Sequence, residues 1–147
     1  MKIAIGCDHG ALALKETVKN ILAELGMEAD DIGTFTEESV DYPDIAEQVC
    51  EKVVSGAAER GVVLCGTGIG ISMAANKIKG IRCALCGDVY SARMARAHND
   101  ANMLALGGRV LGPGLAGEIV RAFFTQGFEG GRHARRVGKI MALENKE

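Results

Sequence analysis

GVVLCGTGIGISMAANK, residues 61–77, gives the clearest signal for the class of fold. It starts with a short apolar run, which is typical of a β-strand that is covered on both faces. The glycine-rich turn GTGIG follows, and a helix is expected from about Ile71 to Lys77. A buried strand, a glycine turn and a helix in this order predict one repeating unit of a parallel sheet.

The same alternation extends outward in both directions. Further strands are expected at 2–6, 27–33, 81–87 and 102–108, and further helices at 11–25, 44–54, 88–98, 115–125 and 132–144. The pattern predicts an α/β fold with three layers, α/β/α: a Rossmann-like, mostly parallel five-stranded sheet with helices on both faces and a C-terminal helix. A length of 147 residues fits a single domain, 1–147.

Composition excludes several classes of protein. The net charge of -2 and an aromatic content of 4% disfavour a nucleic-acid partner, which usually selects a strongly basic chain. No apolar run reaches the roughly 18 residues that a membrane helix needs. The five cysteines are odd in number, and no signal peptide precedes the first strand. We therefore expect free thiols and a cytoplasmic location.

The GTGIG turn offers closely spaced backbone N–H groups at the start of a helix, an arrangement that favours an anion or an oxyanion. It lacks the lysine of a phosphate-binding Walker loop, and the dinucleotide fingerprint would be expected after the first strand. ATP and NAD are therefore poor candidates. The alternative is that the glycines form only a turn.

Cys65 is the last strand residue before that turn, where the start of a helix favours an ionised thiol that can act as a general base. The alternative is a small buried core residue. Asp8 and His9 follow the first strand and could bind a hydroxylated ligand, although Asp8 could equally cap a helix. Strand ends also precede Asp88 and Arg109. Because parallel strands end at one edge, we expect these residues to converge there.

A second group of candidates lies further along the chain. His98 ends a helix and could move a proton near neutral pH, or simply interact with the helix dipole. Arg132 and Arg136 are four residues apart, so both project from one helix face and could grip a phosphate. The alternatives are a solvated basic face, or RNA binding through the adjacent stripe of Arg135 and Lys139.

Cys83 and Cys86 form a CxxC pair, which is a weak signal for zinc or redox chemistry. One pair supplies only two of the four ligands of a structural zinc site. In a strand, residues three apart point to opposite faces. We expect no metal site here.

Taken together, these segments resemble one family, the type B ribose-5-phosphate isomerases, which are related to the galactose-6-phosphate isomerase subunits. The segments that carry the resemblance are GCDHG (6–10), DYPD (41–44), LCGTGIGISMAANK (64–77), GIRCAL (80–85), HNDANMLALGGRV (98–110) and EGGRHARRV (129–137). They occur in family order and spacing over nearly the whole chain.

The resemblance implies an aldose–ketose isomerase that interconverts D-ribose 5-phosphate and D-ribulose 5-phosphate without metal, nucleotide or other cofactor. It implies that Cys65 is the proton-abstracting base and that His98 opens the furanose ring. The implied substrate-binding residues are Asp8, His9, Gly66, Thr67, Gly68, Ile69, Gly70, Asn99, Arg109, Arg132 and Arg136. The family is at least dimeric, so a homodimer or tetramer with an active site shared between subunits is expected.

Two other functions stay open at this point. One keeps the chemistry and changes the substrate to a six-carbon sugar 6-phosphate, such as allose or galactose 6-phosphate. The other is a sugar-phosphate-binding protein that lacks catalysis and has no need of Cys65. The sequence does not decide the substrate's chain length, the oligomeric state, or the roles of Cys7, Cys83 and Cys86.

Overall fold

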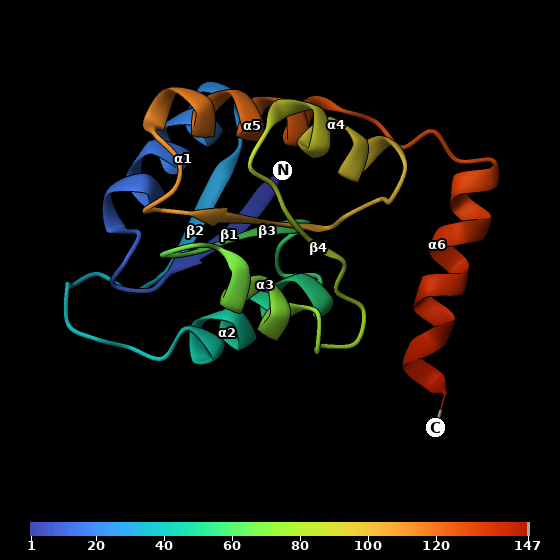
Figure 1. Cartoon of the computed structure of the whole chain (residues 1–147), viewed down its shortest axis with the longest axis horizontal. Helices are drawn as coiled ribbons and strands as arrows, with labels where there is room; N and C mark the ends of the chain where they lie inside the picture. The colour runs from blue at the N-terminus through green and yellow to red at the C-terminus, as the bar shows by residue number, and fades with distance from the viewer. Residues whose placement is uncertain (147) are drawn as a thin grey trace.

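The computed structural model describes residues 1–146 and has an all-parallel five-stranded sheet between two layers of helices (Figure 1). The elements are β1 (Lys2–Cys7), α1 (Leu12–Glu24), β2 (Glu28–Gly33), α2 (Tyr42–Val54), β3 (Arg60–Cys65), α3 (Ile69–Ala75), β4 (Cys83–Leu85), α4 (Val89–Ala97), β5 (Met103–Gly107), α5 (Pro113–Thr125), α6 (Arg132–Ala142) and a final 3-10 turn, Leu143–Asn145. The predicted fold class is confirmed.

The strand order β2-β1-β3-β5-β4 places the chain reversal between the neighbouring strands β1 and β3. After β1 the chain enters α1 on one face, and after β3 it enters α3 on the other face (Figure 1). Open α/β sheets bind ligands beyond the carboxyl ends of strands at such a reversal. The loops that follow β1 and β3 are therefore the natural position for a site.

Each face of the sheet buries its own apolar cluster. Helices α1, α4 and α5 cover one face around Leu22, Leu104 and Phe123. Helices α2 and α3 cover the other face around Val49 and Ile71. This two-sided burial explains why β3 is apolar along its length rather than alternating.

Two elements differ from the sequence expectation. Helix α3 begins at Ile69, because Gly68 adopts the left-handed φ of +79° that ends the turn. Strand β4 spans three residues, since the Arg82 N–H donates to the Asn102 side chain at 2.8 Å instead of extending the ladder. The expectation from glycines and apolar residues therefore made the turn before α3 and the strand β4 longer than they are in the structure.

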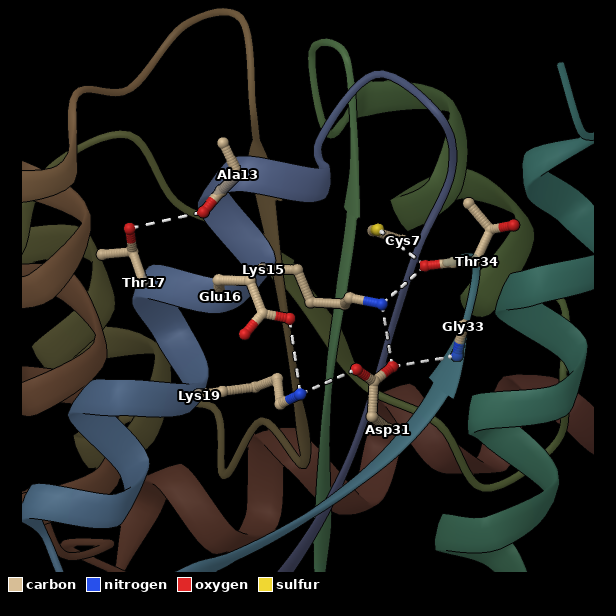
Figure 2. Close-up of polar contacts among 9 residues, drawn as sticks. All are labelled: Cys7, Ala13, Lys15, Glu16, Thr17, Lys19, Asp31, Gly33 and Thr34. Carbon is tan, nitrogen blue, oxygen red and sulfur yellow. Dashed lines mark hydrogen bonds and ion pairs between the residues drawn. The ribbon is translucent and has the colours of Figure 1, made fainter. Parts of the chain in front are cut away.

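Lys15 of α1 is only 1% exposed, which is unusual for a lysine. Its Nζ donates to Asp31 Oδ1 at 2.9 Å and to the Thr34 carbonyl at 2.6 Å (Figure 2). It also lies 4.6 Å from the centre of the Phe35 ring. Asp31 also accepts from Lys19 at 3.0 Å. The buried ammonium thus holds the start of the 34–41 loop against α1.

Helix α6 stands beside the body of the fold rather than against the sheet (Figure 1). Its far end is tied to the body by the Gly80 N–H, which donates to Glu144 Oε1 at 2.8 Å. A hollow of about 670 Å³ lies between α6 and the 76–84 segment, with Ile140 and Leu143 on its wall. Within residues 1–146, every helix is too short or too polar to cross a lipid bilayer.

Candidate active site

Cys65 ends β3 and directs its sulfur at the glycine turn. The Gly68 N–H donates to Sγ at 3.2 Å, although the residue is only 5% exposed and its other neighbours are apolar. An N–H aimed at sulfur stabilises the thiolate, which is the nucleophilic and basic form. Cys65 therefore lies at the glycine turn, not sealed away from it.

The turn needs its glycines for steric reasons. A Cβ on Gly68 would lie 2.8 Å from the Leu106 carbonyl carbon, and a Cβ on Gly70 would lie 2.6 Å from the Tyr42 ring. Tyr42 is the first residue of α2, and its ring packs against Gly70 in the first turn of α3. The turn is thus held between the β5 backbone and an aromatic ring.

Two of the five N–H groups in the turn donate to side chains of residues 65–70. The Gly68 N–H donates to Cys65 Sγ, and the Ile69 N–H donates to Thr67 Oγ1 at 3.2 Å. The N–H groups of Gly66, Thr67 and Gly70 have no such side-chain bond in the described part of the chain. These three groups are the ones that can receive an oxyanion beside the sulfur.

Asp8 and His9 follow β1 at the same edge. The Asp8 N–H donates to the Leu64 carbonyl at 3.0 Å, and its buried carboxylate accepts the Gly10 N–H at 2.8 Å. His9 Nδ1 accepts the Val40 N–H at 3.2 Å, so the 34–41 loop orients this ring. With Nδ1 engaged, Nε2 is the nitrogen of His9 that can face a ligand.

Arg109 follows β5 and reaches the same turn. Its backbone N–H donates to the Gly66 carbonyl at 2.9 Å. Its guanidinium lies over Gly66, where an added Cβ would come within 3.3 Å of Nη1. Asp8, His9, Cys65, the turn and Arg109 therefore meet at the carboxyl edge of the sheet.

Asp88 occupies the same edge but has a structural role. It caps α4 by accepting the Ser91 N–H at 2.6 Å and the Ser91 hydroxyl at 2.8 Å. These hydrogen bonds lower the pKa of the Asp88 carboxyl. Its hydrogen-bonding capacity is used within its own helix.

His98 and Asn99 lie at the opposite edge. Helix α4 starts after the carboxyl end of β4 and runs back, so its C-cap residue His98 precedes the start of β5. The turn after His98 is fixed by Asp100, which has a φ of +46° and accepts from Arg96 Nη1 at 2.8 Å. Six residues of β3, about 16 Å of strand, separate the two edges.

Arg132 and Arg136 join this second group. The Glu129 N–H donates to the Ala97 carbonyl at 2.9 Å, which places the start of α6 beside His98. Both arginines are exposed on the first turns of α6 and form no ion pair with any residue of the described chain. They are free to receive an anion.

The expected site residues therefore form two groups that a single chain keeps apart. The carboxyl-edge group holds the sulfur, the glycine turn and Arg109. The amino-edge group holds His98, Asn99, Arg132 and Arg136. Cys65 and His98 lie at opposite ends of the parallel strands, so a single rigid chain does not bring His98 to the sulfur of Cys65.

The rings of His98 and His133 are stacked, with centroids 4.1 Å apart and planes 5° from parallel. With Glu129 they offer three potential metal ligands within 4.8 Å of one another. A metal bonded to two imidazoles has to lie in both ring planes. Parallel stacked planes share no point, so this arrangement does not fit a chelated ion.

The remaining cysteines are thiols of low reactivity. Burial raises the pKa of Cys7 to about 11 and that of Cys86 to about 11, and it also raises the pKa of Cys83. All five cysteines are free. Cys83 and Cys86 form neither a disulfide nor, within residues 1–146, a metal cluster.

Sequence reasoning missed three contributors to the site. Tyr42 was part of the quoted DYPD segment but had no assigned role, and Lys15 was not among the candidate residues. Glu129 was part of the quoted EGGRHARRV segment but had no assigned role. Of the three, only Lys15 had a signal in the sequence: it is a polar residue at a position of the α1 pattern where an apolar core residue is expected.

Comparison with known proteins gives a consistent result. The family described as Ribose/Galactose Isomerase matches residues 3–140. Ribose-5-phosphate isomerase B of Escherichia coli K12 is 48% identical over 145 residues, covering 99% of this chain and 97% of the relative. D-erythrulose-4-phosphate isomerase of Pectobacterium atrosepticum is 45% identical over 148 residues, covering 100% and 97%. The solved ribose-5-phosphate isomerase B of Clostridium thermocellum has a TM-score of 0.95 and 56% identity, covering 98% and 97%.

Proposed function

The chain belongs to the Ribose/Galactose Isomerase family, and from this premise we propose that it interconverts D-ribose 5-phosphate and D-ribulose 5-phosphate, with Cys65 as the base. The observation that carries the residue assignment is the Gly68 N–H, which donates to Cys65 Sγ at 3.2 Å. This contact joins a potential thiolate to a turn that can receive a developing oxyanion.

In the proposed reaction, the Cys65 thiolate removes the proton from C2 of the open-chain aldose. The electron pair of the C2–H bond forms the C1=C2 double bond, and the carbonyl electron pair moves onto O1. The thiol then returns a proton to C1, while the hydroxyl proton on O2 passes to O1 as the ketose forms. One base thus serves both carbon atoms.

Negative charge develops on O1 in this sequence. The N–H groups of Gly66, Thr67 and Gly70 lie in the same turn as the sulfur and supply fixed donors for that charge. A single preorganised donor of this kind is typically worth about 2.7–4 kcal/mol. The arginine that lies over Gly66, Arg109, adds a positive charge on the same side.

The other group of residues supplies the remaining steps. Ribose 5-phosphate is mainly a ring and must open before C2 becomes acidic, and we assign that step to His98. Arg132 and Arg136 bind the phosphate through charge-assisted hydrogen bonds. Binding energy from this remote phosphate fixes the sugar relative to the sulfur.

Because one chain separates these groups, we propose a homodimer in which each site takes Cys65 from one subunit and His98 from its partner. The exposed C-terminal segment supports this arrangement, since Ile140 of α6 is 46% exposed, Leu143 of the following 3-10 turn is 58% exposed, and α6 stands beside the sheet. A two-fold axis would pair the two edges twice and give two equal sites.

We also propose that the protein works in the cytoplasm. Five free cysteines, four of them buried, are the usage expected where thiols stay reduced.

The test is an isomerase assay that offers ribose 5-phosphate, allose 6-phosphate and erythrulose 4-phosphate side by side. We expect the highest kcat/KM with ribose 5-phosphate and loss of the exchange of its C2 proton with solvent in Cys65→Ala. Higher kcat/KM on another sugar would overturn the substrate assignment. Exchange that survives in Cys65→Ala would overturn the base assignment.

A further inference from the structure

The Glu129 carboxylate lies at the edges of the two stacked histidine rings and pairs with both. Its Oε2 is 3.6 Å from His98 Nε2, and its Oε1 is 3.6 Å from His133 Nε2. The two parallel rings thus present the same nitrogen to the two oxygens of one carboxylate. Two donors and two acceptors match one to one.

The backbone fixes the position of this carboxylate. The Glu129 N–H donates to the carbonyl of Ala97, the residue directly before His98. Gly130 and Gly131 follow with φ values of +71° and +56°, which residues with a Cβ atom rarely adopt. These two glycines turn the chain into α6. The start of α6 then brings His133 back over His98.

His133 is buried, and its pKa lies below the ordinary value of histidine even though the nearby Glu129 carboxylate raises it. Burial lowers its pKa, and the nearby His98 and Arg132 lower it further. Two imidazolium rings stacked at 4.1 Å would repel each other. A neutral ring carries its proton on one nitrogen only, and the carboxylate favours that proton on Nε2.

We propose that Glu129 is a positioning residue that holds His98 with its proton on Nε2, so that the Nδ1 lone pair faces the sugar. This inference rests on the ring-opening role proposed for His98. Nδ1 then accepts the proton of the anomeric hydroxyl as the C1–ring oxygen bond breaks. The O1–H electron pair forms the carbonyl, and the ring oxygen takes the proton back from Nδ1.

His133 holds the His98 ring plane, while Glu129 selects the tautomer. The Nε2-to-oxygen distances of 3.6 Å are long for hydrogen bonds, and catalytic hydrogen bonds often tighten only when substrate binds. The carboxylate itself stays off the sugar and acts through the imidazole. This is why its removal should affect ring opening and leave proton transfer at carbon unchanged.

The test is the variant Glu129→Gln, which keeps the side-chain shape and removes the charge. Glu129 is exposed, so folding should survive. Turnover of ribose 5-phosphate should fall about 10- to 100-fold in kcat, the range for outer partners that orient a functional histidine. Exchange of the C1 proton of ribulose 5-phosphate should stay within about 2-fold. Ribulose 5-phosphate cannot close a ring through O5, which carries the phosphate, so it bypasses ring opening.

A second readout does not depend on turnover. The chain has three histidines, so long-range proton–nitrogen NMR can resolve the His98 ring in the full-length protein. We expect the Nε2–H form in the wild type and a loss of that preference in Glu129→Gln. Glu118→Gln, the same change on the exposed face of α5, is the matched control and should alter neither measurement.

The possible results separate the two proposals. An unchanged ribose 5-phosphate kcat, an equal loss in both assays, or a wild-type Nδ1–H form would overturn the role of Glu129. Each of these results leaves the proposed function standing. A wild type that neither turns over ribose 5-phosphate nor exchanges ribulose 5-phosphate protons would overturn the function itself.

Discussion

Cys65 and Gly68 are joined by a hydrogen bond in which the glycine N–H donates to the cysteine sulfur at 3.2 Å. Gly68 has a φ of +79°, which glycine adopts readily, and it belongs to the turn that places this N–H beside the end of β3. The N-cap residue of α3 therefore also contacts the proposed base.

The first prediction concerns that glycine. In Gly68→Ala, the new Cβ would lie 2.7 Å from the Leu85 side chain and 2.8 Å from the Leu106 carbonyl carbon, so the turn has to move. We expect kcat to fall about 100-fold or more, the effect typical of a lost oxyanion or orienting donor. The control is Gly114→Ala in α5, where a Cβ meets open space. It should leave kcat unchanged and slightly stabilise the helix.

A second prediction separates the arginines of α6. Arg132→Gln and Arg136→Gln should each raise KM for ribose 5-phosphate about 10-fold or more, because each removes a charged hydrogen bond to phosphate. The inhibition constant of inorganic phosphate should rise in proportion. Arg135→Gln makes the same change on the adjacent stripe and should stay within about 2-fold. Equal effects for all three variants would indicate a general electrostatic attraction by the positive charges of α6 instead of a specific phosphate site.

The sequence predicted the three layers and the parallel sheet, because buried strands and helical spacing leave a direct pattern along the chain. Its convergence argument held for Asp8, His9, Cys65 and Arg109, which follow strand ends. It gave no position for His98, which follows a helix. Helix direction in the fold places that residue at the opposite edge, and residue spacing alone does not show this.

The Lys15 cluster shows a different limit of sequence reasoning. The lysine is buried because Asp31 and Thr34 (Figure 2), together with the Phe35 ring, surround it only in the folded chain. The same holds for Glu129, because its proposed role depends on contacts with two histidine rings that come from distant parts of the chain. Long-range partners of this kind have no fixed sequence spacing, so pattern reading does not find them.

A third prediction follows from Asp31. Burial alone would raise its pKa, but hydrogen bonds from Lys15, Lys19 and Gly33 outweigh burial and leave the pKa below its usual range. A lowered pKa stabilises the fold above the ordinary pKa, and that stabilisation disappears as pH falls through the lowered value. Stability should therefore drop with acid below about pH 4, and the drop should be smaller in Asp31→Asn.

The measurement is urea unfolding across pH at one protein concentration. At pH 7, Asp31→Asn should reduce the free energy of unfolding by about 3 kcal/mol, because it leaves a buried ammonium without its partner. Asp30→Asn is the control, since the Asp30 carboxylate pairs with the half-exposed Lys52 at 4.0 Å and the change should cost less than about 1 kcal/mol. Parallel pH curves for the wild type and Asp31→Asn would contradict the argument.

The last prediction tests whether the two edges combine between subunits. Cys65→Ala and His98→Asn should each lose most of their activity on ribose 5-phosphate. When the two variants are unfolded together and refolded, a mixed dimer has one site with both native residues and one site with neither. Random pairing makes half of the dimers mixed, so about a quarter of wild-type activity should return. A site contained within one chain would give no recovery, because every chain in the mixture lacks one residue. Refolding either variant alone is the control, and it should remain inactive at every protein concentration.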